Sequence, residues 1–233
     1  MVCGIPYTNF RSILGGPDAL RRTSFVPAAF RFRRDRCVPC GPHGRPSRTT
    51  VRAMLIRATE SALVVIDMQE RLVPAMQAPA RTLRNTRLLL AAAREMDVPI
   101  LLTEQYPEGL GRTMPEILAA AGDAPVLPKL HFSCMEDPGF AAAFRALGRK
   151  QAVIAGMEAH ICVMQTAASL LEEGIEVFVV SDATASRTSE SERACIDRLQ
   201  AIGAGIVTTE MAVYEWLGRA GTDSFRALLK LIR

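Results

Sequence analysis

The chain has 233 residues, of which 49% are hydrophobic and 22% charged, and its formal net charge is +4. This composition is ordinary for a globular protein and excludes disorder along the whole length. No apolar run reaches the roughly 18 residues that a membrane-spanning helix needs, so we expect a soluble protein without membrane contact. Residues 1–53 hold ten arginines against two acidic residues, whereas residues 54–233 hold 18 Lys and Arg against 22 Asp and Glu. The basicity therefore belongs to the N-terminal segment, and no nucleic-acid partner is predicted for the remainder.

Residues 1–53 form an Arg- and Pro-rich leader that we expect to be disordered. It contains six of the 14 prolines and five of the 16 glycines, and it shows neither helical nor strand periodicity. Its charge balance is typical of an organelle transit peptide, but the true start could equally be Met54. Cys37 and Cys40 have C-x-x-C spacing, yet no second pair completes a zinc site, so no metal or redox chemistry is predicted there.

From residue 62 onward, short β-branched runs alternate with longer helical patterns, which is typical of a parallel sheet wrapped by helices. The predicted strands are 62–66, 98–102, 125–127, 152–155, 177–180 and 205–208. The predicted helices lie near 79–96, 114–121, 138–147, 162–173, 189–202, 210–217 and 222–231. Because the strands are apolar at every position, we expect burial on both faces. The prediction for residues 54–233 is one three-layer α/β/α sandwich with a six-stranded, mostly parallel, Rossmann-like sheet.

Reactive side chains lie at the ends of three of the predicted strands. Asp67 follows the first strand, Lys129 follows the third, and a turn after the fourth delivers Cys162 to the start of a helix. Ligands of open parallel sheets bind beyond the carboxyl ends of the strands, so these three groups are expected to meet.

An acid, an ammonium and a thiol suit acyl transfer through a thioester. A helix N-terminus and a nearby cation favour the thiolate, so we expect Cys162 to react with iodoacetamide near pH 6. A carboxylate can take the thiol proton and later give it to a leaving amine. Backbone N–H groups at the helix start can receive the oxyanion.

Each of these residues also has a purely structural interpretation. Free cysteines are often buried, an Asp commonly caps a turn, and a loop lysine is usually solvated. Cys134 and Cys195 are taken as core or surface thiols, and His131 as an isolated imidazole. Only the joint placement of Asp67, Lys129 and Cys162 favours catalysis.

Four segments resemble the isochorismatase-like family of cysteine hydrolases, in family order. They are Ala62–Gln69 (ALVVIDMQ), Pro128–Ser133 (PKLHFS), Ile154–Val163 (IAGMEAHICV) and Ser181–Thr184 (SDAT), the last placed after the fifth strand. The resemblance implies an Asp67-Lys129-Cys162 triad and a cis peptide bond between Met157 and Glu158. It also implies an oxyanion hole made by the backbone amides of Glu158 and Cys162, and a homo-oligomer whose neighbouring subunits close the pocket.

Two departures from family patterns narrow the activity. Nicotinamidases carry an Asp-x-His pair and a further His that bind a metal after the second strand, where this chain reads TEQYPEGLG over residues 103–111. No metal or other cofactor is therefore expected. Isochorismatases proper hydrolyse a vinyl ether without a thiol, whereas Cys162 is present here. The TEQYPEGLG stretch is similar to the isochorismatase domain-containing subgroup, which implies the triad but no particular substrate.

The sequence thus predicts a hydrolase that cleaves the C–N bond of a small amide or a related acyl substrate. Two alternatives stay open: a catalytically idle member that acts as a binding or scaffold protein, and direct attack by water in the isochorismatase manner. Nearness to the triad in sequence suggests five substrate-binding side chains: Gln69, Gln105, Tyr106, Phe132 and His160. Three cysteines after Met54 and no hydrophobic signal segment predict a cytoplasmic protein, or an organelle-matrix protein if the leader is a transit peptide.

Overall fold

The computed structural model describes residues 55–232, and the predictions made for residues 1–53 fall outside them. Six parallel strands form one sheet in the order β3-β2-β1-β4-β5-β6. The strands are β1 (Ser61–Ile66), β2 (Ile100–Gln105), β3 (Val126–Lys129), β4 (Gln151–Met157), β5 (Glu176–Ala185) and β6 (Gly205–Val207). The sheet is thus fully parallel, and strand order reverses between β1 and β4, where such folds bind ligands.

Eight α-helices surround the sheet within the described residues. They are α1 (Pro79–Glu95), α2 (Pro107–Leu110), α3 (Pro115–Ala121), α4 (Pro138–Ala146), α5 (Met164–Glu172), α6 (Ser189–Ala201), α7 (Thr209–Leu217) and α8 (Asp223–Ile232). A proline opens each of the first four helices, where its fixed φ suits the first turn and its missing N–H removes no helical bond. Thr188 and Thr208 cap α6 and α7 through their hydroxyl oxygens. None of the helices in residues 55–232 has the length and apolar character needed to cross a bilayer.

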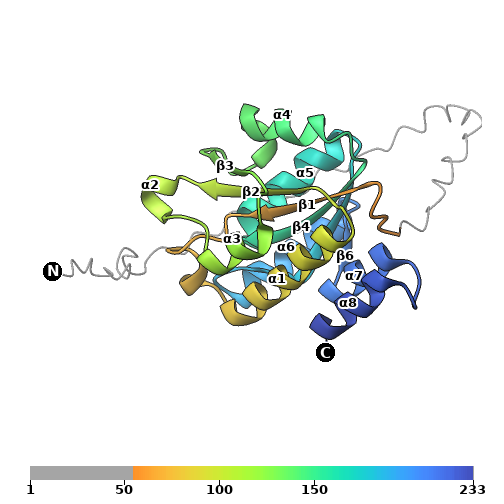
Figure 1. Cartoon of the computed structure of the whole chain (residues 1–233). Helices are drawn as coiled ribbons and strands as arrows, with labels where there is room; N and C mark the ends of the chain where they lie inside the picture. The colour runs from red at the N-terminus through yellow and green to blue at the C-terminus, as the bar shows by residue number, and fades with distance from the viewer. Residues whose placement is uncertain (1–54, 233) are drawn as a thin grey trace, which may run out of the picture. The chain divides into compact units, whose positions relative to one another are not determined.

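The hydrophobic core has two halves, one on each face of the sheet. Helices α1, α3, α7 and α8 contribute to the first half, and α4, α5 and α6 contribute to the second (Figure 1). All residues of β1 and β4, the two central strands, are buried because helices cover both faces. The predicted three-layer sandwich is therefore confirmed, and it leaves the carboxyl ends of the central strands as the place for polar chemistry.

Every strand differs from its predicted bounds by at least one residue, and two strands differ most, for identifiable reasons. β2 begins only at Ile100, after Pro99, which has no N–H to donate to a ladder, and it continues through polar residues to Gln105. β5 extends to Ala185, so the segment 181–184 lies within this strand rather than after it. The pairing of β4 with β5 is irregular between Ile154 and Gly156: Ile154 pairs with Val179 and Gly156 with Thr184, so the extra residues lie in β5. The prediction ended both strands at their first polar residues, which are held in the strands by partners distant in sequence.

Candidate active site

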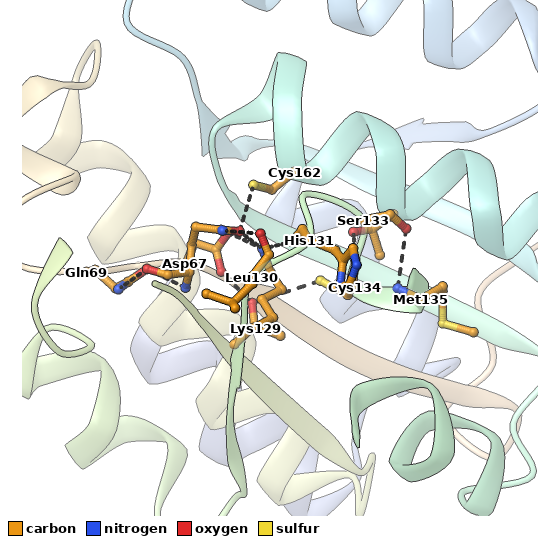
Figure 2. A network of polar contacts seen from close by, with 12 residues as sticks. Asp67, Gln69, Lys129, Leu130, His131, Ser133, Cys134, Met135 and Cys162 are labelled. Atoms are coloured by element: carbon orange, nitrogen blue, oxygen red, sulfur yellow. Dashed lines mark hydrogen bonds and ion pairs between the residues drawn. The ribbon is translucent and has the colours of Figure 1, made fainter. Parts of the chain in front are cut away.

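The side chains that follow β1, β3 and β4 meet at one edge of the sheet. Asp67 directly follows β1, Lys129 is the last residue of β3, and Cys162 lies in the turn after β4. Their exposed fractions are 0%, 2% and 5%. Figure 2 shows the three side chains converging from these separate elements. The structure thus brings together the three residues that the sequence singled out.

The Asp67 carboxylate is held on both oxygens. Lys129 Nζ lies 2.8 Å from Asp67 Oδ2, and Thr103 Oγ1 donates to Asp67 Oδ1 at 2.7 Å. The Asp67 backbone adopts a left-handed conformation with φ of 52°, and its N–H donates to the Thr103 carbonyl. A non-glycine residue in this region is uncommon and requires support from its surroundings. The backbone and Thr103 together aim the carboxylate at the lysine.

The Lys129 ammonium has an acceptor for each of its three protons. Besides Asp67, it donates to Gln105 Oε1 at 2.6 Å and to the His131 carbonyl at 3.3 Å. A fully buried ammonium is stable only when its charge is paired and its donors are satisfied. Both conditions are met here, so the lysine is fixed in place in its charged form.

Two glutamines hold the ends of the strands around this ion pair. The Gln69 side chain accepts from the Gln105 backbone N–H at 2.8 Å and donates to the carbonyls of Gln105 and Gly111. The Gln105 side chain in turn donates to the Leu130 carbonyl at 2.8 Å. Gln69 is fully buried and both atoms of its side-chain amide form hydrogen bonds within the protein, so the structure gives it a role in holding the strand ends, and its contact with substrate stays a prediction.

Cys162 lies in the turn that precedes α5, and not at the start of that helix as predicted. Residues Ala159–Val163 form a single π-helical turn, and α5 begins after it at Met164. The thiol donates a long hydrogen bond, 3.9 Å, to Gln105 Oε1, which also accepts from Lys129. The sulfur is therefore connected to the Asp67–Lys129 pair through one amide oxygen.

The charge state of the thiol differs from the one we expected. Burial raises the pKa of Cys162 above its usual value, the Asp67 carboxylate raises that pKa further, and the Lys129 charge opposes both without overcoming them. Burial alone would lower the pKa of Lys129, but the Asp67 charge outweighs it and the pKa is raised. Burial and the Asp67 charge thus favour the neutral form of the Cys162 thiol, and alkylation of Cys162 near pH 6 stays a prediction.

The turn that carries Cys162 begins at the proposed oxyanion hole. The peptide bond between Met157 and Glu158 is cis, and the Glu158 side chain accepts from Arg187 Nε at 2.8 Å. The exposed Arg187 was not singled out from the sequence, because nothing in its neighbourhood marks it as part of this turn. This ion pair fixes the side chain of a residue whose backbone amide is proposed to take part in catalysis.

The remaining predicted substrate-binding residues are more exposed. Tyr106 and Phe132 are 53% and 54% exposed, and they flank the buried residues Gln105 and Lys129 in sequence. His160 is partly buried, and its Nδ1 lies 2.9 Å from Ser186 Oγ. These three side chains stay candidates for substrate contact.

Thr103 and Cys134 are two further buried residues near the ion pair that sequence reasoning did not place in the site. The Cys134 thiol contacts Thr103 Oγ1 at 4.0 Å, the same hydroxyl that donates to Asp67. Burial raises the pKa of Cys134 to about 12, and because its side chain is fully buried we assign it no chemistry. Thr103 lies two positions before Gln105 in β2, and this i, i+2 spacing was the available signal.

The described residues contain no group of three His, Cys, Asp or Glu side chains arranged to hold a metal ion. A cavity of about 690 Å³ lies against α1, α7 and α8, lined by residues such as Arg84, Asn85, Asp182 and Leu231. None of the residues around the Asp67–Lys129 pair lines it. The candidate active site is therefore defined by its buried charged groups and thiol, not by this cavity.

The fold and the buried acid–amine–thiol cluster define a parallel α/β protein of the hydrolase type. The family model described as "Isochorismatase domain" matches residues 61–211. Isochorismatase domain-containing protein 2 of Danio rerio is 37% identical over 74% of this chain and 86% of the relative. Isochorismatase domain-containing protein 1 of Salmo salar is 33% identical, and the match covers 79% of this chain but 64% of that longer protein. The chain therefore belongs to the isochorismatase-like hydrolase family.

Solved structures support the same assignment. The MAR1 ribonuclease of Caenorhabditis elegans is 33% identical, with a TM-score of 0.73 over 77% of this chain and 92% of that chain. YcaC of Escherichia coli, an octameric hydrolase of unknown specificity, is 26% identical with a TM-score of 0.74 over 78% and 92% of the two chains. YcaC of Pseudomonas aeruginosa, solved with covalent acrylamide, is 26% identical with a TM-score of 0.74. The match covers 77% of this chain and 92% of that chain.

Proposed function

We propose that this chain is a cysteine hydrolase that cleaves a small amide or a related acyl substrate through a thioester on Cys162. The observation that carries the proposal is the buried ion pair of Asp67 and Lys129, joined to the Cys162 thiol through Gln105. A packing cysteine needs no such partners, whereas a nucleophile needs a proton acceptor beside it. A neighbour with covalent acrylamide, a small electrophilic amide, adds support for a nucleophile on this fold.

The first half of the reaction forms the thioester. The Cys162 sulfur attacks the substrate carbonyl carbon while its proton passes to Asp67, and the carbonyl oxygen becomes an oxyanion. The backbone amides of Glu158 and Cys162 donate to that oxyanion. As the C–N bond breaks, Asp67 returns the proton to the leaving amine.

The second half restores the enzyme. A water molecule attacks the thioester carbonyl while Asp67 accepts its proton, and the tetrahedral intermediate then expels the sulfur. The acid product leaves, and the proton on Asp67 returns to the sulfur. The Lys129 ammonium, 2.8 Å from Asp67, limits the repulsion between the carboxylate and the developing thiolate.

Removal of the nucleophile is the direct test. We expect Cys162→Ala to abolish turnover on any small amide that the parent cleaves, and Cys162→Ser to reduce it by at least about 10³-fold, because the acylation route is lost. Cys134→Ala is the matched control, since this thiol is also buried close to the ion pair but is assigned no chemistry. Intact mass spectrometry after a rapid quench should show an acyl adduct on the parent and none on Cys162→Ala.

The outcomes separate the alternatives. Full turnover by Cys162→Ala would establish direct attack by water and overturn the covalent scheme. No turnover and no adduct across a broad amide panel would favour an idle, binding member of the family.

A short RNA is added to the substrate panel because one structural neighbour is a ribonuclease. We expect no RNA cleavage, because residues 54–233 carry four more acidic than basic residues and repel phosphates.

We also propose that the protein forms a homo-oligomer. The octameric neighbour supports this proposal, and so do three exposed apolar residues on adjoining segments, Tyr106, Leu130 and Phe132, which we call the apolar patch. Their exposed fractions are 53%, 69% and 54%, and the Tyr106 N–H donates to the Lys129 carbonyl next to Leu130. Clustered apolar surface of this kind commonly marks an interface. A second copy of the chain is the proposed occupant.

A further inference from the structure

The Gln105 side chain contacts both the Lys129 ammonium and the Cys162 thiol. A role in substrate binding alone does not explain this position. Its single Oε1 accepts from Lys129 Nζ at 2.6 Å and from the Cys162 thiol at 3.9 Å. Its Nε2 donates to the Leu130 carbonyl, which fixes which end of the amide faces the site. The side chain therefore presents an acceptor, and not a donor, to the sulfur.

An acceptor in this position selects the protonated thiol. A thiol can donate to an amide oxygen, whereas a thiolate beside the same oxygen meets a second partial negative charge and has no proton to offer. The lysine cannot compensate, because its three protons already go to Asp67, Gln105 and the His131 carbonyl. No Lys129 N–H is left to form a hydrogen bond with the sulfur.

We infer that Gln105 is a positioning residue that withholds Lys129 from Cys162 and so keeps the nucleophile protonated until it attacks. The inference rests on the proposed function for its catalytic consequence, but the protonation state itself can be measured without any substrate. The other groups that act on the thiol are Asp67 after β1, Lys129 in β3 and Cys134 after β3. Gln105, in β2, is the neutral group between them.

Keeping the proton matters for the type of bond that is cleaved. An amine is a poor leaving group unless it is protonated as it departs, and in this scheme its proton comes from the thiol by way of Asp67. A thiol already ionised to bulk water reaches the tetrahedral intermediate without that proton. An aryl ester needs no such proton, since a nitrophenolate leaves as an anion. Gln105 should thus favour amides over activated esters.

The test compares Gln105→Met with Gln105→Glu. Met has a similar length and lacks the amide oxygen, so a Lys129 N–H becomes available to the sulfur. Glu keeps the oxygen and adds a negative charge beside the thiol. We expect alkylation of Cys162 by iodoacetamide at pH 7 to be at least about tenfold faster in Gln105→Met than in the parent, which corresponds to a thiol pKa about one unit lower. In Gln105→Glu it should be slower than in the parent.

Peptide mass spectrometry resolves Cys162 from the other five cysteines of the full chain. Gln69→Met is the control for a general disturbance of the strand ends. The Gln69 side chain forms hydrogen bonds with the Gln105 backbone but none with Lys129 or Cys162. We expect this variant to lower the melting temperature without a comparable change in alkylation rate. Equal rates of Cys162 alkylation in the parent, Gln105→Met and Gln105→Glu would overturn the inference. Faster alkylation in Gln105→Met, Gln105→Glu and Gln69→Met alike would also overturn it.

Hydrolysis supplies the second readout. If a substrate amide is found, the ratio of kcat on that amide to kcat on the matching nitrophenyl ester should fall at least about tenfold in Gln105→Met relative to the parent. Equal losses on amide and ester would assign Gln105 a merely structural role and overturn the inference. If no substrate is cleaved by the parent, the proposed function fails, whereas the alkylation series still decides the role of Gln105.

Discussion

At the scale of single residues, the site depends on a buried ion pair whose two members need each other. Asp67 and Lys129 have fully buried side chains 2.8 Å apart. Removing one member of such a pair leaves an uncompensated charge in the interior, which costs more than the pair itself contributes. The two residues to which we assign catalytic roles are therefore also expected to affect stability.

Lys129→Met should be strongly destabilised for this reason. We expect its free energy of unfolding to fall by about 3–5 kcal/mol, and the double variant Asp67→Asn/Lys129→Met to recover a large part of that loss. Urea unfolding of the parent, both single variants and the double variant gives the complete cycle. A double variant less stable than Lys129→Met would show that the charge is not what destabilises the single variant.

The same pair adds a pH dependence at the alkaline end. The pKa of Lys129 in the folded state lies above its usual value of 10.5. The stabilising contribution of the charged lysine is therefore complete below about pH 10.5 and is lost as pH rises through the folded-state pKa. The parent and Asp67→Asn/Lys129→Met should therefore change in stability in parallel up to about pH 10, and the parent should lose more stability than the double variant above about pH 10.5.

At the scale of elements, the turn after β4 depends on a close approach between β4 and β1. Gly156 has a φ of 133°, and a Cβ added there would overlap the backbone oxygen of Ile66, its partner in β1. A backbone atom cannot move aside as a flexible side chain can. The position that leads into the Cys162 turn therefore requires glycine.

Gly156→Ala should disrupt the fold at this junction. We expect a loss of stability above about 3 kcal/mol, or loss from the soluble fraction, since both strain and overlap must be relieved. Gly174→Ala is the matched control: Gly174 also has a positive φ, 79°, but a Cβ there meets no atom within 4 Å. That control should lose only about 1–2 kcal/mol. Thermal unfolding of both variants measures these losses of stability. Equal losses in Gly156→Ala and Gly174→Ala would contradict the prediction.

The same elements show what the sequence could and could not reveal. The prolines before α1, α3 and α4 and the apolar runs of β1 and β4 are local signals, and the prediction located these elements to within a residue or two. The polar ends of β2 and β5 were missed, because their strand pairing is with residues distant in sequence. Thr103 and Gln105 pair with Leu127 and Lys129 of β3, and Thr184 pairs with Gly156 of β4. The raised pKa of Cys162 could not be read from sequence either, since it depends on burial and on the distance to Asp67.

At the scale of the whole molecule, the candidate active-site residues Asp67, Lys129 and Cys162 are buried, whereas apolar residues next to them in the chain are exposed. Leu130 and Phe132 follow Lys129 directly in the chain, so the segment that supplies the cation also supplies much of the apolar patch. A partner subunit seated on this patch would exclude water next to the ion pair. Lower access of water strengthens electrostatic interactions at such a site.

Leu130→Glu in the full chain should weaken the proposed oligomer, because assembly would bury an unpaired carboxylate in an apolar interface. We expect light scattering after size-exclusion chromatography to show an oligomer for the parent and a shift toward monomer for Leu130→Glu at the same concentration. Ile202→Glu is the matched control, since Ile202 is 42% exposed at the end of α6 and lies outside the patch. A parent that stays monomeric, or equal dissociation by Ile202→Glu, would refute the assignment of this patch. Dissociation confined to Leu130→Glu, accompanied by faster alkylation of Cys162, would link assembly to the burial of the nucleophile.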